Sequence, residues 1–283
     1  MKLCRYNDNQ IGIVRADGVH NITTIVDKLE PHRHPFPLGD ALIANLESLR
    51  DEMEALADSA TPVPISQVKL LSPVANPSKI IGTPQNYEAH ALEATADLTI
   101  SQGKQRRPLK DQGLFLKATS SLVGAGEGIN IRFPDRRTDH EAELGVVIGK
   151  PCSQVTPDEA LSFVAGYAAA LDMVVRGPED RSFRKSIDTY SVLGPWLITS
   201  DELPAPSSFP FTLSVNGELR QSAHTSEMIL SVEEQISWAS QYYTLLPGDI
   251  IMTGTCDGVG PVRPGDTIDI RFEGLAQMQV GVS

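Results

Sequence analysis

Apolar residues recur at three- and four-residue steps over residues 42–56, namely Leu42, Ile43, Leu46, Leu49, Met53 and Leu56. That spacing places them on one face of a single amphipathic helix. A strand-like segment precedes it at residues 12–14, and a proline-rich run at 61–64 and a short strand-like stretch at 68–71 follow it. Ser72-Pro73 then interrupts the pattern. We therefore expect a small N-terminal α+β domain over residues 1–72.

Beyond that boundary, short segments alternate apolar and polar residues between glycines and prolines, which is typical of sheets. Asn216-Gly217 separates two such segments, 211–215 and 218–221, and is a strong hairpin signal. Pro-Gly-Asp turns precede further strand-like runs at 250–253 and 267–272. Helices are expected to begin at Thr156 and Ser231, each with a glutamate three residues later. Residues 73–283 thus form a second, larger domain, and the fold class is α+β and β-rich.

The composition narrows the range of partners. The 283 residues carry a formal net charge of −12, so nucleic acids and anionic membrane surfaces are not expected to bind. No stretch has the roughly 18 consecutive apolar residues of a membrane span, and no apolar signal-peptide core follows the first residues. The three cysteines are far apart and lack zinc-type spacing. We expect a cytoplasmic protein with free thiols.

The segment Asp139-His140-Glu141-Ala142-Glu143 leads into an apolar strand. Because side chains alternate along a strand, Glu141 and Glu143 project to the same side, opposite Ala142 and Leu144. Two neighbouring carboxylates are tolerable on a solvated strand face, or in the interior when a cation lies between them. The pattern alone leaves both alternatives open.

Asp172 lies in the most apolar neighbourhood of the chain, residues 166–175. A buried aspartate is costly unless it is paired or bound to a metal. Together with Glu141 and Glu143 it would form an all-oxygen site suited to Mg²⁺ or Mn²⁺. The alternative is that Asp172 is a buried cap or ion-pair partner.

Further candidates for chemistry are a histidine, two lysines and a threonine. His90 and Glu93 are three residues apart in a predicted helix, so Glu93 can fix the tautomer of His90 and raise its basicity for activating water. Lys185 and Lys117 are candidate electrophiles or carboxylate binders, and the hydroxyl of Thr255, at the end of a strand, could meet a ligand. The alternatives are a surface His/Glu pair, surface charges and a turn hydrogen bond.

Taken in order, several motifs resemble the fumarylacetoacetate hydrolase family from about residue 73 to residue 283. They are Asn86-Tyr87-x-x-His90-x-x-Glu93, Phe115-Leu116-Lys117-x-x-Ser120-Ser121-Leu122, Asp139-His140-Glu141-x-Glu143-Leu144, Gly166-Tyr167, Lys185-Ser186-x-Asp188-Thr189 and Thr253-Gly254-Thr255. The resemblance implies a mixed β-sandwich roll with a small N-terminal domain, a homodimer, and one Mg²⁺ or Mn²⁺ per subunit.

Carried over residue by residue, the resemblance implies metal ligands at Glu141, Glu143 and Asp172, a His90/Glu93 dyad, and an active-site lysine at Lys185. It places Arg176 and Thr255 at the substrate, and Lys117 is a further expected substrate-binding residue. The chain also departs from the family. Where relatives often have Asn-Asp and then Arg-Asp-x-Gln, it has Leu171-Asp172 and Arg176-Gly177-Pro178-Glu179, which bears on substrate identity.

The reaction implied is hydrolysis of a carbon–carbon bond in a 3-acylpyruvate-type or related 2-oxo acid through a metal-stabilised enolate. Decarboxylase, isomerase and lyase reactions pass through the same enolate and stay open, as does a non-catalytic protein that binds metal and a 2-oxo acid. Residues 86–111 are a candidate lid, and the polar stretch 101–111 is expected to be its flexible part, less ordered without ligand.

Overall fold

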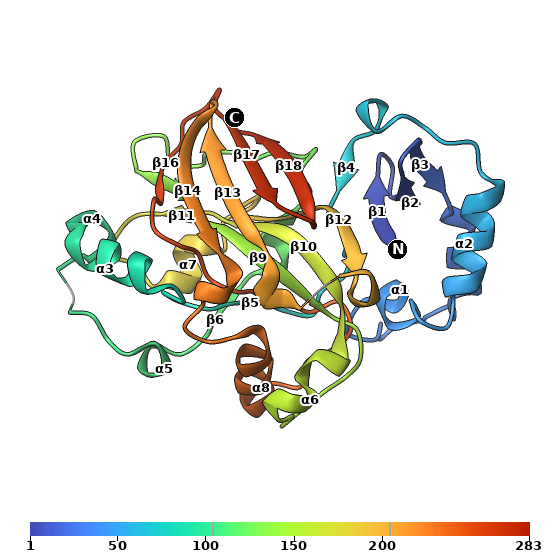
Figure 1. The fold of residues 1–283 in the computed structure, drawn as a ribbon, viewed down its shortest axis with the longest axis horizontal. Coiled ribbons are helices and arrows are strands. Elements are labelled where there is room, and N and C mark those ends of the chain that lie inside the picture. The colour runs from blue at the N-terminus through green and yellow to red at the C-terminus, as the bar shows by residue number, and fades with distance from the viewer. Residues whose placement is uncertain (104, 204) are drawn as a thin grey trace.

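The computed structural model describes residues 1–103, 105–203 and 205–283, and within them the strands form one large mixed sheet and two smaller sheets (Figure 1). The large sheet contains, in spatial order, β3 (Gly18–Asn21), β2 (Gln10–Arg15), β1 (Lys2–Tyr6), β12 (Ser191–Thr199), β10 (Val164–Asp172), β9 (Ala142–Ile148), β15 (Ile250–Met252), β5 (Ile80–Gly82) and β6 (Phe115–Lys117), with β4 (Leu70–Leu71) beside β1 and β7 (Leu122–Val123) beside β12. The second sheet has the order β14 (Glu218–His224), β13 (Pro210–Val215), β17 (Thr267–Phe272), β18 (Ala276–Gly281). The third consists of β11 (Val174–Val175), β8 (Thr138–His140) and β16 (Gly260–Pro261).

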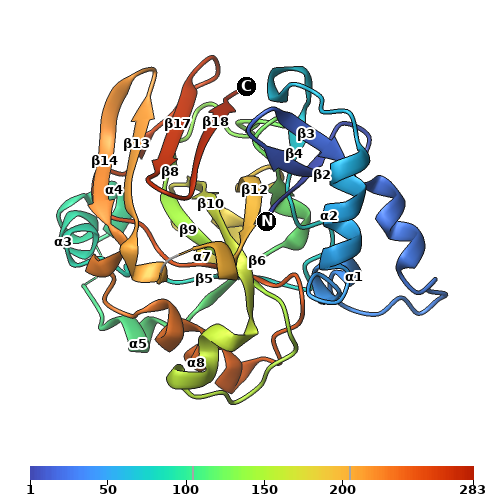
Figure 2. The same cartoon turned by 45° about the vertical axis from the view of Figure 1, so that its right-hand side comes forward.

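The helices are short and lie around the sheets (Figures 1 and 2). The α-helices are α1 (Ala41–Ala44), α2 (Arg50–Ser59), α3 (Glu88–Ala96), α4 (Leu98–Ser101), α5 (Leu109–Gln112), α6 (Pro157–Ala160), α7 (Arg181–Lys185) and α8 (Val232–Tyr242). Short 3-10 helices occur at Thr23–Lys28, Ile65–Gln67, Thr119–Ser121, Leu161–Phe163, Ser200–Glu202, Pro206–Ser208 and Thr225–Glu227. In both views α3 and α4 lie on the opposite side of the molecule from α2. In the described residues, no helix is long and apolar enough to cross a bilayer.

The large sheet is buried on both faces, which explains the nearly continuous apolar sequence of its central strands. Leu144 of β9 and Leu171 of β10 belong to one hydrophobic cluster, together with side chains of the second sheet. Val147 and Ala168, on the alternate positions of the same strands, belong to another cluster that includes N-terminal residues. The polar residues of β9 and β10 therefore lie inside the protein and need partners there.

The N-terminal residues continue the large sheet, because β1 pairs antiparallel with β12. Asp40 also connects the two parts. Its carboxylate accepts hydrogen bonds from the main-chain nitrogens of Leu42 and Ile43, which caps α1, and from those of Ala75 and Asn76. The domain boundary at 72/73 stays a prediction, and one sheet runs across it.

Several local predictions are confirmed. Asn216 and Gly217 form the turn between β13 and β14 with φ angles of 51° and 81°. Left-handed values at both positions are what such a tight hairpin requires. The helices that begin after Thr156 and Ser231 each carry the expected capping box. Local sequence therefore determines these turns and caps.

The single helix expected over residues 42–56 is wrong. The chain forms α1, turns at residues 45–49, and then forms α2. Asn45 ends the first helix, and its side chain donates a 2.8 Å hydrogen bond back to the carbonyl oxygen of Ala41. Leu46 and Met53 still lie in one hydrophobic cluster. The apolar pattern thus predicts which residues are buried, but side-chain-to-backbone bonding ends the helix early.

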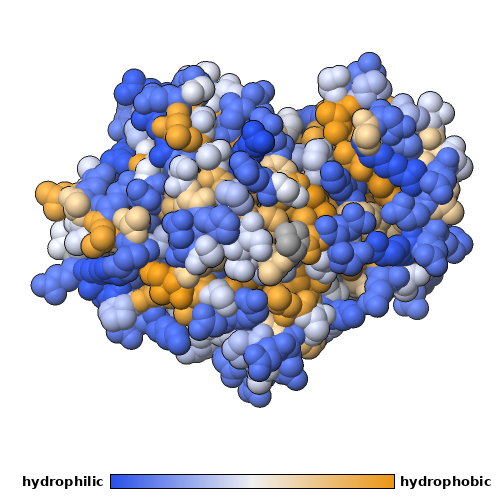
Figure 3. Space-filling model, viewed as in Figure 1, coloured by the Kyte–Doolittle hydropathy of each residue, from blue (hydrophilic) through white to orange (hydrophobic). Residues whose placement is uncertain are grey.

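The candidate lid consists of α3, α4 and α5, and residue 104 within it lies outside the described residues. Over α3 and α4, apolar side chains reach the surface, as they do in several other places on this face (Figure 3). Leu92 and Leu98 are 58% and 72% exposed there. The expected flexibility of residues 101–111 stays a prediction.

Candidate active site

Three carboxylates converge where β9 and β10 run side by side. In the pairing of these strands Ala170 faces Glu143, and the main-chain nitrogen of Asp172 donates a 2.9 Å hydrogen bond to the carbonyl oxygen of Glu141. One ligand atom from each of Glu141, Glu143 and Asp172 lies within 4.8 Å of the others. All three residues are buried, so the alternative of a solvated strand face is wrong. The alternation argument also placed Glu141 within a strand, and this is wrong, because Glu141 lies between β8 and β9.

Cations balance two of these carboxylates. The Nζ atom of Lys185 donates to Glu141 and to Asp172, and the Nζ atom of Lys117 donates to Asp172 and to the carbonyl oxygen of Tyr190. Arg176 donates to Glu141 at 3.2 Å. Asp172 is therefore a buried ion-pair partner, which was one of its two alternatives, and it also faces the other two carboxylates.

Glu143 is different, because it has no cation within ion-pair distance in the described residues and accepts a hydrogen bond only from the main-chain nitrogen of Gly254, at 2.8 Å. Burial and the charge of Asp172 raise the pKa of Glu143 well above its usual range. Burial also acts to raise the pKa of Glu141, but the charges of Lys185 and Arg176 outweigh it and hold that pKa at about 2. The cluster thus retains negative charge beside Glu143. Three carboxylates are hard oxygen ligands, so the arrangement fits a divalent cation such as Mg²⁺ or Mn²⁺.

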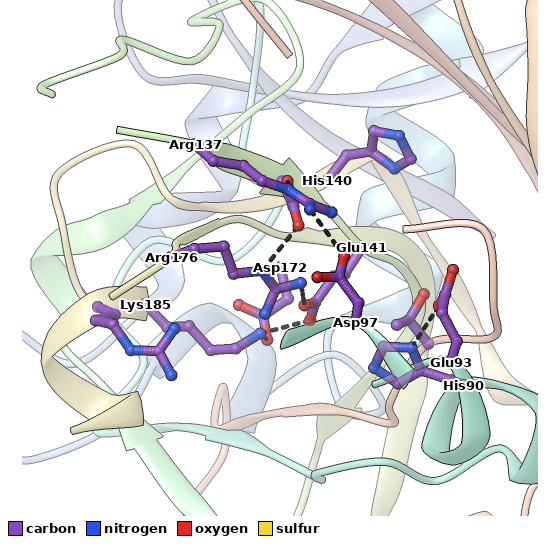
Figure 4. Close-up of polar contacts among 12 residues, drawn as sticks. His90, Glu93, Asp97, Arg137, His140, Glu141, Asp172, Arg176 and Lys185 are labelled. Atoms are coloured by element: carbon purple, nitrogen blue, oxygen red, sulfur yellow. Dashed lines mark hydrogen bonds and ion pairs between the residues drawn. The ribbon is translucent and has the colours of Figure 1, made fainter. Parts of the chain in front are cut away.

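Figure 4 shows the carboxylates in a wider network that extends to the candidate lid. Arg176 donates to Asp139 at 2.8 Å, and Asp139 also accepts from Arg137 at 2.7 Å. Arg137 in turn donates to Asp97, between α3 and α4, at 2.8 Å. The acidic cluster and the lid helices are therefore joined by one chain of ion pairs.

His90 and Glu93 lie together on α3, as their spacing predicts. His90 Nδ1 lies 3.1 Å from Glu93 Oε2, and the other oxygen of Glu93 accepts a 2.9 Å hydrogen bond from the main-chain nitrogen of Gly258. The loop after β15 thus fixes the carboxylate that orients the imidazole. His90 is buried and lines the same small cavity as the three carboxylates. The alternative of a surface His/Glu pair is wrong.

This inner cavity has a volume of about 80 Å³. Lys185, Arg176 and Thr255 line it, as does His90. The hydroxyl of Thr255 donates to the carbonyl oxygen of Ala142 at 2.8 Å. Lys117 is absent from the lining among the described residues and lies behind Asp172. The predicted site residues therefore occupy one place in the fold, with Lys117 one layer further back.

Sequence reasoning missed several residues at this place. Gln85, Phe115, Arg181 and Arg184 line the inner cavity and also a neighbouring outer cavity of about 580 Å³. The sequence does contain one signal for Arg181 and Arg184, which is their spacing. Arg181, Arg184 and Lys185 are spaced to share one face of a short helix directly after Asp180, an N-cap residue.

Comparison with known proteins places this fold and site. Residues 79–283 match the family described as fumarylacetoacetate (FAA) hydrolase C-terminal. The maleylpyruvate hydrolase of Aquipseudomonas alcaligenes is 48% identical over 284 residues, which cover 100% of this chain and 99% of that protein. The crystal structure of maleylpyruvate hydrolase from Sphingobium sp. SYK-6, in complex with manganese (II) ion and pyruvate, is 38% identical with a TM-score of 0.83 and covers 100% of this chain and 98% of its own. Oxaloacetate tautomerase Fahd2a of Rattus norvegicus is 35% identical over 233 residues, 78% of this chain and 71% of that protein.

A β-rich roll with a buried acidic cluster that can hold a metal, beside a histidine, defines the class of protein: an enzyme acting on small ketonic acids. The chain belongs to the fumarylacetoacetate hydrolase family. The expected fold class and the expected activity, hydrolysis of a carbon–carbon bond in a ketonic substrate, are confirmed at that level.

Proposed function

We propose that this enzyme hydrolyses a 3-acylpyruvate of the maleylpyruvate type and releases pyruvate and a carboxylic acid. The observation that carries the proposal is the cluster of Glu141, Glu143 and Asp172 in one cavity with His90. The 48% identical maleylpyruvate hydrolase and the related crystal structure with manganese and pyruvate support the same substrate head group, a 2-oxo acid.

Glu141, Glu143 and Asp172 are the proposed ligands of Mg²⁺ or Mn²⁺. The manganese of the related structure supports Mn²⁺, and the all-oxygen donor set suits Mg²⁺ as well. Bound there, a divalent ion would supply the positive charge that stabilises an enolate next to the carboxylate of a 2-oxo acid.

His90 is the proposed general base. With the proton on Nδ1 held by Glu93, the Nε2 atom of His90 can accept a proton from water. The water oxygen then attacks the carbonyl carbon of the acyl group. The bond from that carbon to the pyruvate methylene breaks, and its electron pair stays with the pyruvate unit as an enolate. Return of the proton from His90 to the methylene carbon of the enolate gives the methyl group of pyruvate, and the acyl group, which now carries the water oxygen, leaves as the carboxylic acid.

The remaining site residues bind and orient the substrate. Lys185, in the cavity, is proposed to hold or polarise the diketone. Arg176 and Thr255 contact the 2-oxo acid, and the guanidinium of Arg176 suits its carboxylate. The hydroxyl proton of Thr255 goes to Ala142, so Thr255 contributes to the wall of the cavity. Lys117 is expected from the sequence to bind substrate but does not line the cavity, and its hydrogen bonds to Asp172 and to the carbonyl oxygen of Tyr190 support a role in orienting Asp172 instead.

We further propose that the protein acts in the cytoplasm as a homodimer on a small 2-oxo acid, without nucleic-acid or membrane partners. The net charge of −12 supports the absence of anionic partners, and three buried free cysteines are consistent with a reducing compartment. The loop before α1 offers apolar surface for a partner subunit, since Phe36 and Leu38 are 70% and 77% exposed.

The test is turnover of maleylpyruvate, acetylpyruvate, oxaloacetate and 3-deoxy-2-oxo sugar acids with Mg²⁺, with Mn²⁺ and with EDTA. We expect stoichiometric pyruvate and acid from the acylpyruvates, with no product in EDTA. His90→Asn should reduce kcat about 100-fold or more. His224→Asn, which changes a histidine bonded only to Ser226 among the described residues, should leave kcat unchanged.

Two results would contradict the proposal. Decarboxylation or tautomerisation of oxaloacetate without acylpyruvate cleavage would favour the alternative reactions. Oxaloacetate is included among the substrates because the chain is 35% identical to an oxaloacetate tautomerase. Binding of oxalate with Mg²⁺ without product from any 2-oxo acid would indicate a non-catalytic binding protein.

A further inference from the structure

Arg181 places a positive charge beside the acidic cluster, and it forms no ion pair with a carboxylate of the described residues. It begins α7, and its Nη2 atom donates a 3.0 Å hydrogen bond to Oε1 of Gln112, a neutral side chain. Its guanidinium carbon lies 5.4 Å from the centre of the Phe115 ring. Throughout the described residues, no aspartate or glutamate lies within ion-pair distance of this guanidinium. A partly buried arginine of this kind is unusual, since such groups are normally paired.

The two acidic residues nearest to Arg181 in the sequence are engaged elsewhere. Asp180 caps α7, with its side chain accepting a 2.8 Å hydrogen bond from the main-chain nitrogen of Ser182. Glu179 forms a bidentate ion pair with Arg136, at 3.0 and 2.7 Å. Neither of these two carboxylates therefore forms an ion pair with Arg181.

Arg181 is also positioned to meet a ligand. It lines both the inner cavity that contains the carboxylates and the outer cavity of about 580 Å³. Arg184 lines the same two cavities, and its hydrogen bonds go to the main-chain carbonyl oxygens of Glu179 and Val175, at 2.9 and 3.1 Å. Two guanidinium groups without a carboxylate partner among the described residues thus lie between the inner and the outer cavity and line both.

Neutral amides hold Arg181 in this position. Gln112 donates from Nε2 to Oε1 of Gln85 at 2.7 Å while its own Oε1 accepts from Arg181. Gln85 has a left-handed φ of 48°, a conformation that costs energy for a residue other than glycine and is often found at functional sites. The amides orient the guanidinium without cancelling its charge.

We propose that Arg181, supported by Gln112 and Arg184, binds a second carboxylate at the far end of the substrate, and that it selects dicarboxylic over monocarboxylic acylpyruvates. This inference rests on the proposed function, because it supposes that the 2-oxo acid end lies at the acidic cluster. A substrate bound in that way extends from the inner cavity into the outer one. Its distal carboxylate then meets a fork of N–H donors whose geometry matches it.

The test compares kcat/KM for maleylpyruvate, which carries a distal carboxylate, with that for acetylpyruvate, which lacks one. We expect Arg181→Gln to lower kcat/KM on maleylpyruvate on the order of 100-fold and to change it less than about threefold on acetylpyruvate. Arg181→Lys should recover part of the loss. The matched control is Arg15→Gln, because Arg15 lines neither cavity and is paired with Glu54 and with Asp58, each at 2.8 Å. It should affect both substrates little.

A binding measurement separates this inference from catalysis. Inhibition by 2-oxoheptanedioate and by 2-oxoheptanoate, matched in length and differing in the distal carboxylate, should favour the diacid in the wild-type enzyme and lose that preference in Arg181→Gln. Equal losses on both substrates would overturn the inference, because they would mean that Arg181 is only structural. A wild-type enzyme that cleaves acetylpyruvate as well as maleylpyruvate would also overturn it and leave the proposed function standing. A wild-type enzyme that cleaves neither would instead refute the proposed function.

Discussion

The main-chain nitrogen of Asp172 donates its hydrogen bond to the carbonyl oxygen of Glu141, so the last residue of β10 lies directly beside the residue that precedes β9. Directly opposed residues on adjacent strands have side chains about 5 Å apart. One hydrogen bond between strands therefore fixes the separation of two of the three carboxylates. The third, Glu143, follows two residues later.

Glu143→Gln tests the metal assignment with little change of shape. The amide oxygen can still accept from the nitrogen of Gly254, but the charge is lost. We expect Mn²⁺ affinity, measured by calorimetry, to fall about 100-fold or more, with hydrolase activity lost in parallel. Asp158→Asn, at an exposed position of α6, is the control and should bind Mn²⁺ as the wild type does. Unchanged Mn²⁺ affinity in Glu143→Gln would remove Glu143 from the metal site.

Lys117→Met tests the buried ion pair behind the site. Both side chains of the Lys117–Asp172 pair are fully buried, so removing the lysine leaves Asp172 with one cation instead of two. We expect the free energy of unfolding, from urea titration, to fall by about 3–5 kcal/mol. Combining Lys117→Met with Asp172→Asn should cost less than the sum of the single changes. Lys150→Met breaks the exposed pair with Glu47 and should have no measurable effect. If the losses in free energy of unfolding from the two single changes added exactly in the double variant, Lys117 and Asp172 would not be energetically coupled.

Asn86→Ala tests how α3 is anchored near the site. The buried Asn86 side chain donates to the carbonyl oxygens of Thr253 and Leu230, at 2.8 and 3.0 Å, and accepts from the nitrogen of Leu230. Its loss leaves buried main-chain groups unpaired, at about 1–3 kcal/mol for each group. Urea unfolding should register that loss, while Asn130→Ala at an exposed position changes stability by less than about 0.5 kcal/mol. Equal stabilities of the two variants would contradict the anchoring role.

The thiols should be unreactive in the native protein. Burial raises the pKa of Cys4 and Cys256 to about 12 and that of Cys152 to about 11. At pH 8 we expect a disulfide reagent such as Ellman's to label none of them until denaturant is added, when all three react. Labelling of the folded protein within minutes would mean that at least one thiol is accessible.

The same shifts predict how stability changes in alkaline solution. A buried thiol keeps its proton when the protein is folded, whereas in the unfolded chain it ionises as the pH rises through 9.0. The unfolded state then binds fewer protons, so the free energy of unfolding should decline above that pH. Replacing Cys256 by Ala should reduce the slope between pH 9 and pH 11 in urea titrations.

Much of the site could be predicted from sequence because its residues are close along the chain. Period-two alternation pairs Glu141 with Glu143, and helical spacing pairs His90 with Glu93. Asp172 is a candidate because it is a carboxylate within an apolar stretch, where it needs a partner or a metal. The resemblance to a family joined these fragments, whereas no local rule indicates that β9 and β10 pair in the register that brings Asp172 to Glu141.

Other features depend on long-range packing and could not be predicted. Arg181 meets Gln112 because α7 packs beside β6, the strand that follows Gln112 in the chain. The charge of Arg181 and the separation of the two residues in the sequence do not determine that contact. The break between α1 and α2 depends on the hydrogen bond that Asn45 makes and on burial of Leu46 against residues far along the chain. In both places tertiary packing overrides the local pattern.

The pairing of β1 with β12 limits how this protein can be shortened. A fragment beginning at residue 73 would lose β1 and leave the main-chain groups of β12 at Leu197 and Ile198 without their partners, beside the apolar side chains that N-terminal residues now cover. A bare strand edge of that kind is a template for pairing with other chains. Such a truncation would retain every proposed catalytic residue and yet be expected to precipitate during expression.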